Sequence, residues 1–202
     1  MYYEKDYKDK LASMYPDVLM KYEVPFEGVR ADAVLFTDPV TAFEIKSEKD
    51  NLLRLQNQVD KYFRVFTRVI VLAHESKISD VVRLLSDTPA GIWSMNDKRE
   101  VKVCVEGKAS AERISLAAVY NMLRKPERDL VLRRYQGYLP GVDDFHYYRD
   151  RLERFLKLPK TEVLKDLETI LKLRYVEQRS GLPWDGNTVA KILMQAMEEN
   201  HD

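Results

Sequence analysis

The chain has 202 residues, of which 45% are hydrophobic and 33% are charged. This balance is typical of a globular protein and excludes an intrinsically disordered one. The 33 basic and 33 acidic residues cancel, so the overall charge neither supports nor excludes binding to nucleic acid, which needs only a local basic groove.

The single cysteine, Cys104, excludes an internal disulfide and a zinc site built on thiolates, and it indicates a reducing compartment. The N-terminal sequence MYYEKDYKDK is too charged for a signal peptide. No apolar run approaches the ~18 residues that a membrane span needs. We therefore expect a cytoplasmic protein with no membrane partner.

The hydrophobic pattern of the first half of the chain predicts alternating helices and strands. Apolar residues at steps of three and four predict helices, whereas short apolar or alternating runs between turn residues predict strands. In chain order we expect a helix over 2–15, strands over 18–24, 31–36 and 41–46, a helix from Ser47 to about 66, a strand over 68–73, a helix over 79–85, and strands over 91–95 and 101–106. The helix start at Ser47 rests on Asp50, three residues later, which resembles a capping box.

The character of the sequence changes after Gly107. From Glu112 onward the strand signal disappears and helical patterns dominate. We therefore predict an α/β unit over residues 1–107 and a mainly helical region over residues 108–202.

Asp32 stands inside an apolar predicted strand, where an unpaired carboxylate would be costly to bury. Twelve residues later, Glu44 and Lys46 flank Ile45 on the next predicted strand. Neighbours on a strand point to opposite faces, so Glu44 and Lys46 share one face and Ile45 points to the other. A carboxylate that needs compensation thus lies near a second carboxylate and an ammonium group.

The register between these two strands decides whether the three side chains meet. Asp32 and Glu44 share a face only if the pairing register is even. A three-residue loop gives this register: with Thr37–Pro39 as the loop, Asp32 lies opposite Glu44, and with Asp38–Val40 it lies opposite Lys46. A two-residue turn without a bulge would separate them.

Two carboxylates on one patch repel each other, and a hard cation such as Mg²⁺ relieves that repulsion. The ion would lower the pKa of a bound water and stabilise charge on a phosphoryl oxygen, while Lys46 would orient the water or offset that charge. On the following helix Gln58 and Tyr62 are four residues apart, and Arg54 lies one turn earlier. These groups suit contacts to phosphates and base edges.

Three segments resemble the successive motifs of the PD-(D/E)XK nuclease superfamily: Arg30-Ala31-Asp32, Phe43-Glu44-Ile45-Lys46 and Gln58-Val59-Asp60-Lys61-Tyr62. The last segment is similar to the glutamine–tyrosine motif of the RecB-like branch. From Glu23 through Ala73 the sequence looks closest to small stand-alone bacterial and phage members. Ala31 departs from the proline of the motif's name, and the resemblance leaves the region after Gly107 unexplained.

This resemblance implies an α/β fold with a restriction-endonuclease-like αβββαβ core, in which helices flank a mixed sheet. It also implies a site for Mg²⁺, with Mn²⁺ as a substitute. Asp32 and Glu44 would be metal ligands, assisted by the carbonyl group of Ile45, and Lys46 would be the catalytic lysine.

The resemblance implies accessory or DNA-contacting positions for Gln58 and Tyr62. An upstream acidic ligand is less well defined by the motif. Glu23 is the preferred residue, with Glu27 and Glu4 as alternatives.

We therefore expect a Mg²⁺-dependent deoxyribonuclease, with RNA as the alternative substrate. The competing hypothesis is a nuclease fold that does not cleave and instead binds nucleic acid or protein in defence, counter-defence or regulation. A homodimer is a further expectation to test, because cutting both strands of a duplex usually needs two active sites.

Basic residues also gather in the predicted helical region, at Arg124, Lys125, Arg128, Arg133 and Arg134. Such a group is either the solvated face of a helix or a phosphate-contacting surface. The sequence leaves both readings open.

Overall fold

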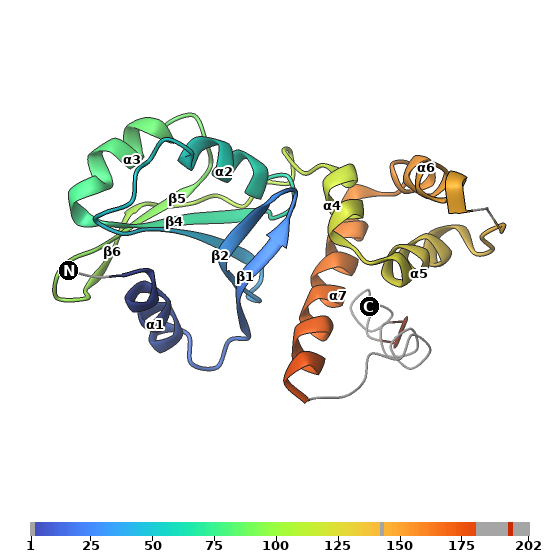
Figure 1. Cartoon of the computed structure of the whole chain (residues 1–202), viewed down its shortest axis with the longest axis horizontal. Helices are drawn as coiled ribbons and strands as arrows, with labels where there is room; N and C mark the ends of the chain where they lie inside the picture. Colours follow the sequence, from blue (N-terminus) through green and yellow to red (C-terminus); the bar gives the residue numbers. More distant parts are fainter. Residues whose placement is uncertain (1–2, 142–143, 181–193, 196–202) are drawn as a thin grey trace. The chain divides into compact units, whose positions relative to one another are not determined.

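The computed structural model describes residues 3–141, 144–180 and 194–195, and it divides the chain into two compact units (Figure 1). The first unit, Met1–Ile114, contains the sheet, and the second begins at Ser115. Within the described ranges no helix is long and apolar enough to cross a membrane.

The first unit has the expected α/β architecture. Its elements, in chain order, are α1 (Glu4–Met14), β1 (Met20–Phe26), β2 (Val29–Leu35), β3 (Thr41–Lys46), α2 (Leu55–Tyr62), β4 (Arg68–His74), a 3₁₀ turn (Glu75–Lys77), α3 (Ile78–Leu84), β5 (Gly91–Met95) and β6 (Val101–Val105). The first six elements give the order αβββαβ. Every strand expected from the sequence is present, with ends shifted by at most a few residues.

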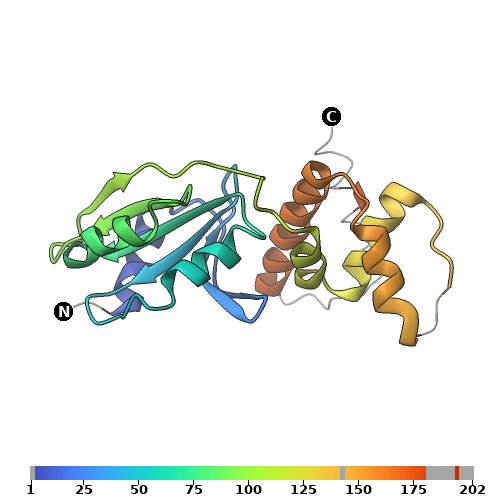
Figure 2. The same cartoon turned by 90° about the horizontal axis from the view of Figure 1, so that it is seen from above.

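The six strands form one mixed sheet in the order β1-β2-β3-β4-β5-β6. Neighbouring strands are antiparallel except for β3–β4 and β4–β5, which are parallel. Parallel neighbours need a crossover connection, and α2 and α3 provide one each. In Figures 1 and 2, α2 and α3 cover one face of the sheet and α1 covers the other.

Helix α1 packs on the centre of the sheet through Tyr7 and Leu11, which are fully buried. They belong to a cluster that includes Phe43 and Ile45 of β3. Because side chains alternate along a strand, these contacts on the α1 face turn the intervening Glu44 toward the face of α2. All six residues of β3 are buried, so the polar residues of this strand need partners inside the protein.

The β2–β3 register selects one of the two loops considered above. Going away from the turn, the paired residues are Leu35–Thr41, Val34–Ala42 and Ala33–Phe43. One further step along this register puts Asp32 opposite Glu44, the arrangement that corresponds to the loop Thr37–Pro39. The pairing stops before that step, so Asp32 lies where the two strands begin to separate.

The prediction that a helix starts at Ser47 is wrong, because α2 begins eight residues later at Leu55. Ser47 and Asp50 do bond to each other: the amide and hydroxyl groups of Ser47 donate to Asp50 Oδ2 at 2.7 and 2.6 Å, and the Asp50 amide donates to the Ser47 carbonyl oxygen at 3.2 Å. They close a single turn. The amide of Leu53 then donates to the side chain of Asn51 at 3.3 Å, a local bond that competes with helix formation.

The first compact unit extends to Ile114, beyond residue 107, where the strand signal of the sequence ends. The intervening segment forms neither helix nor strand, but it stays bound to the first unit. The Ser110 amide donates to the carbonyl oxygen of Thr67 at 2.8 Å, and Arg113 pairs with Asp60 at 3.0 Å. The hydrophobic pattern of the sequence does not indicate hydrogen bonds and ion pairs of this kind.

The second unit is helical wherever the structure describes it. Its helices are α4 (Leu116–Met122), α5 (Lys125–Gln136), α6 (Asp144–Phe155) and α7 (Lys160–Ser180). A buried ion pair joins α7 to the start of α5, with Arg174 Nε 3.0 Å from Glu127 Oε1 and Arg174 Nη2 in contact with Glu127 Oε2. Glu127 is 1% exposed and also accepts a hydrogen bond from the Arg124 amide at 2.6 Å.

Replacing Arg174 with methionine should lower the free energy of unfolding by about 3 kcal/mol, because it leaves Glu127 buried without its cation. Urea denaturation followed by circular dichroism measures the loss. The matched control is Arg133→Met at an exposed position of α5, which should change stability by less than about 0.5 kcal/mol. The double variant Glu127→Gln/Arg174→Met should recover much of the loss, and an equal loss in single and double variants would contradict the role of the pair.

Candidate active site

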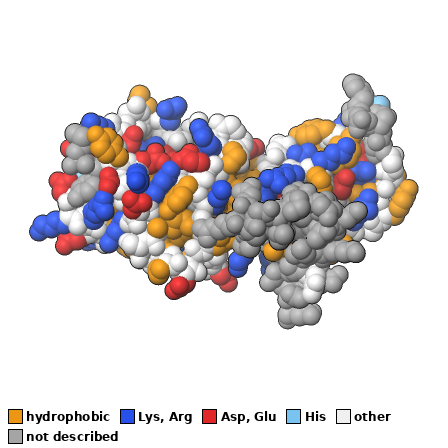
Figure 3. Space-filling model, turned by 60° about the horizontal axis from the view of Figure 1, so that its bottom comes forward, with side chains coloured by type: hydrophobic (Ala, Val, Ile, Leu, Met, Phe, Trp, Pro, Cys, Tyr) orange, Lys and Arg blue, Asp and Glu red, His pale blue; other side chains and the backbone are white. Residues whose placement is uncertain are grey.

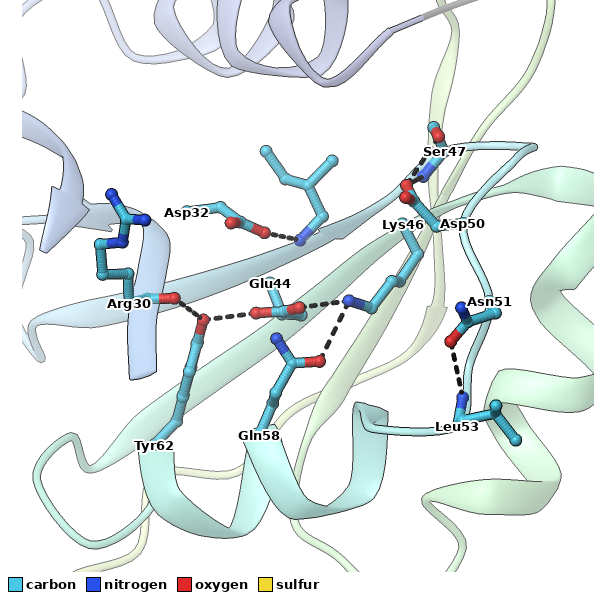
Figure 4. A network of polar contacts seen from close by, with 11 residues as sticks. Arg30, Asp32, Glu44, Lys46, Ser47, Asp50, Asn51, Leu53, Gln58 and Tyr62 are labelled. Atoms are coloured by element: carbon cyan, nitrogen blue, oxygen red, sulfur yellow. Dashed lines mark hydrogen bonds and ion pairs between the residues drawn. The ribbon is translucent and has the colours of Figure 1, made fainter. Parts of the chain in front are cut away.

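Strand β3 and helix α2 bring three polar side chains, Lys46, Gln58 and Tyr62, together around Glu44 (Figure 4). Lys46 Nζ contacts Glu44 Oε1 and donates to Gln58 Oε1 at 3.1 Å. The Tyr62 hydroxyl contacts Glu44 Oε2 and lies 2.7 Å from the carbonyl oxygen of Arg30. Glu44 is 1% exposed. Each of its two carboxylate oxygens nevertheless has a hydrogen-bond donor, Lys46 for Oε1 and Tyr62 for Oε2.

The packing of α2 explains why these residues meet. Leu55, Val59 and Tyr62 are buried, and the Tyr62 ring packs edge-on against Phe26 with centroids 5.2 Å apart. Gln58 is one turn before Tyr62, so both face the sheet beside β3. The four-residue spacing of Gln58 and Tyr62 thus places both side chains on the side of α2 that faces the site.

Asp32 occupies the point where β2 and β3 separate. Its Oδ2 accepts a hydrogen bond from the Ile45 amide at 2.6 Å. In a strand the amide and carbonyl groups of one residue project to the same side. The Ile45 carbonyl oxygen therefore faces the same gap as the Asp32 carboxylate.

Burial, followed by the nearby charge of Glu44, raises the pKa of Asp32 to about 7, although the hydrogen bond from Ile45 opposes the shift. Lys46 also lowers this pKa, and Glu4 raises it further. Burial and the Glu44 charge likewise raise the pKa of Tyr62 far above its ordinary value, so its hydroxyl group remains a hydrogen-bond donor. Both shifts have the same meaning: additional negative charge in this site is unfavourable.

A second group of acids meets Asp32 from the N-terminal elements. Carboxylate oxygens of Glu4 on α1, Glu23 on β1 and Asp32 all lie within 4.8 Å of one another. Lys8 contacts Glu4 and lies 2.5 Å from Glu23 Oε1. Glu23 has a φ of 55°, a costly conformation for a residue with a side chain, at the position where the β1–β2 pairing is interrupted.

The structure brings Asp32, Glu44 and Lys46 to one end of neighbouring strands, as the sequence predicts, but with a difference. Glu44 turns to Lys46 and Tyr62 and is not part of the close group around Asp32. That group contains Glu23, the preferred upstream residue, together with Glu4.

The third upstream alternative and one residue of the predicted substrate face lie elsewhere. Glu27 pairs with Arg64 at 2.8 Å. Arg54 is exposed at the N-cap of α2 and makes none of the contacts around Glu44. The i, i+4 rule that grouped it with Gln58 holds only within a helix, and this helix starts one residue after Arg54.

Sequence reasoning missed Lys8, which neutralises the N-terminal acids. A signal for it exists, because Glu4 and Lys8 have the i, i+4 spacing of a helical ion pair. The contact with Glu23 could not be foreseen, since it depends on where α1 packs.

Residues 11–199 of the chain match the model of a family described as Bacteriophage P4 protein cII. The chain belongs to this family. Its description names a bacteriophage protein and no activity, and no curated protein matches the chain. Among solved structures, the SPO1766 protein of unknown function from Silicibacter pomeroyi aligns with a TM-score of 0.43 at 14% identity, over 70% of this chain and 99% of that one. So distant a likeness carries no argument, and the function has to be argued from the site.

Replacing Asp32 with asparagine should stabilise the protein at pH 8 without divalent ions, raising the melting temperature by about 4 °C. The pKa of Asp32 is about 7 in the folded chain, against a reference value of 3.8. The folded chain therefore binds more protons between these values, and the wild type loses stability as pH rises from about 4 to about 7. The stabilisation measured in thermal melts should shrink steadily as pH falls toward 4. A difference that does not change with pH would contradict a raised pKa.

Proposed function

We propose that the chain is a Mg²⁺-dependent nuclease that hydrolyses DNA phosphodiester bonds through a PD-(D/E)XK-type site at Asp32, Glu44 and Lys46. The observation that carries the proposal is the burial of Glu44 against Lys46 on β3, next to an Asp32 carboxylate with a raised pKa. The order, spacing and strand register of the three residues support it together.

The residues around Asp32 fit a hard divalent cation. Carboxylate oxygens and a main-chain carbonyl are the donors that Mg²⁺ prefers, and Mn²⁺ accepts the same set. We assign Asp32 and Glu44 as ligands, with Glu23 and the Ile45 carbonyl in support. When bound, such an ion polarises a phosphoryl oxygen and lowers the pKa of a water.

Lys46 would act on the reacting phosphate. Its ammonium group is held by Glu44 and Gln58, so its position is fixed on the face that carries the acids. A fixed cation there can orient the attacking water or offset the charge that develops on the phosphate oxygens. Gln58 would position Lys46, and the protonated Tyr62 hydroxyl would orient Glu44. Arg54, exposed at the start of α2, remains a candidate contact for the DNA backbone.

A second candidate function is nucleic-acid or protein binding without cleavage. It is favoured by one observation: both oxygens of Glu44 are engaged by Lys46 and Tyr62, and Glu44 is almost completely buried. If this arrangement persists when Mg²⁺ is present, Glu44 cannot serve as a ligand. Because the family is named for a bacteriophage protein, either function would suit counter-defence or regulation in the cytoplasm of an infected cell.

Incubating the wild type with labelled DNA or RNA, single- or double-stranded, should give cleavage in Mg²⁺ or Mn²⁺ and none in EDTA. Asp32→Asn and Lys46→Met should each lower the rate by about 100-fold or more, because each removes charge needed at the reacting phosphate. The control is Lys102→Met at an exposed position of β6, which should cleave like the wild type. Equal rates in all variants would rule out this site, and binding without cleavage by the wild type would favour the second function.

Tyr62→Phe tests the role of the hydroxyl group that contacts Glu44. We expect the variant to fold, to cleave about tenfold more slowly and to need more Mg²⁺ for half its maximal rate, because Glu44 is less firmly oriented. The matched control is Tyr135→Phe, which removes a hydroxyl bonded to Asp166 in the second unit. A Mg²⁺ requirement unchanged by Tyr62→Phe would argue against an orienting role.

A further inference from the structure

Three helices of the second unit bring tyrosine rings and basic groups together, in a group that we call the tyrosine–basic cluster. It consists of Tyr120 on α4, Lys125 and Arg128 on α5, and Tyr147 and Tyr148 on α6. Lys125 Nζ lies 4.2 Å from the centroid of the Tyr147 ring, and the Arg128 guanidinium group lies 4.4 Å from that of Tyr120. The Tyr120 and Tyr148 rings meet edge to face at 5.5 Å. The cluster is therefore continuous across the three helices.

Tyr148 forms the accessible part of the cluster. The residue is 48% exposed, yet its ring is held on one side by Tyr120, which is fully buried. Its hydroxyl group donates to Asn121 Oδ1 at 2.9 Å. A large ring that is both exposed and fixed is suited to stacking, because little conformational freedom is lost when a flat partner binds.

The start of α5 presents basic side chains. Lys125 and Arg128 lie in the first turns of this helix, and Arg124 is its N-cap residue. The acid of the first turn, Glu127, is buried against Arg174. Positive groups near a helix N-terminus oppose the helix dipole by about 0.3–1 kcal/mol each, so their presence here suits an anionic partner.

The basic residues of the second unit are concentrated in its first part. Residues 115–180 contain 14 Lys and Arg and 10 Asp and Glu, whereas the whole unit, residues 115–202, contains 15 and 14. In Figure 3, Lys and Arg side chains lie close together on the visible surface of this unit, among hydrophobic side chains. Asp129 on α5 accepts a hydrogen bond from the Tyr147 hydroxyl at 2.8 Å and lies 3.4 Å from Arg151, so neighbouring donors already engage this acid.

We propose that the tyrosine–basic cluster binds single-stranded nucleic acid, with Lys125 and Arg128 on the phosphates and a base stacked on Tyr148. Surfaces that bind single strands combine basic side chains, which contact the phosphate backbone, with exposed aromatic rings, on which the bases stack. Bases in a duplex are stacked on each other, and duplex DNA would use only the charges. This inference goes beyond the proposed function, because it concerns the second unit and needs no divalent ion.

The test is fluorescence anisotropy of the full chain in EDTA, with a labelled 20-nucleotide oligothymidylate, the corresponding RNA, and a duplex of the same length. The wild type should bind the single strands more tightly than the duplex. Tyr148→Ala should weaken single-strand binding about fivefold or more. Lys125→Glu should weaken it about tenfold and reduce the salt dependence, since at least one phosphate contact is lost.

Lys172→Glu is the matched control, an equal charge reversal at an exposed position of α7 in the same unit. It should weaken binding less than about twofold, a change typical of diffuse surface charge. Equal losses for Lys172→Glu and Lys125→Glu, full binding by Tyr148→Ala, or a preference for duplex would each overturn the inference. Circular dichroism melts confirm that each variant is folded.

The outcomes also separate this inference from the proposed nuclease activity. Lys102→Met, at an exposed position of β6 outside both sites, should bind single strands in EDTA like the wild type. Binding that depends on Tyr148 in a chain that never cleaves would support the cluster alone. Cleavage with binding that is indifferent to Lys125 and Tyr148 would support the nuclease alone.

Discussion

The burial of Glu44 at the centre of the sheet is the constraint on which the first unit depends. A carboxylate that is 1% exposed is tolerated only with charged or hydrogen-bonding partners. Lys46 supplies the charge from the same strand face, and Tyr62 supplies the hydroxyl group from α2. That helix can reach β3 because it is the crossover between two parallel strands. The parallel pairing, the position of α2 and the polar wall of the site are therefore one arrangement.

Around this centre the acids are neutralised unequally. Lys46 faces Glu44, and Lys8 faces both Glu4 and Glu23. Asp32 lies between these two groups with a main-chain amide as its partner, and among the described residues it has no ion pair. Burial, followed by the nearby charge of Glu44, raises its pKa. In the proposed function, Asp32 is therefore the acid whose charge a metal ion would neutralise, since its neighbours are already paired with lysines.

The sequence predicts those parts of the site that depend on residues close together in the chain. Asp32, Glu44 and Lys46 lie on two strands joined by a short turn, so strand alternation and loop length restrict their arrangement to two registers, and the structure has one of them. The position of Gln58 follows from its spacing to Tyr62. The sequence leaves Glu4 as one of two alternative ligands and does not indicate the role of Lys8, because α1 lies far along the chain from Asp32 and reaches it only by packing across the sheet. The late start of α2 and the boundary at Ile114 depend on side-chain and main-chain bonds in segments without a periodic pattern.

Both units are nearly neutral: residues 1–114 contain 18 basic and 19 acidic residues, and residues 115–202 contain 15 and 14. Within the first unit, acids gather around Asp32. Acids grouped in this way repel the phosphates of a nucleic acid. A nuclease with these residues therefore needs binding energy from another surface. In the second unit, Lys125 and Arg128 lie beside the exposed, fixed ring of Tyr148. These basic groups have the sign that the acids around Asp32 lack. Under the two proposals, hydrolysis by the first unit and binding by the second would therefore serve the same nucleic-acid substrate.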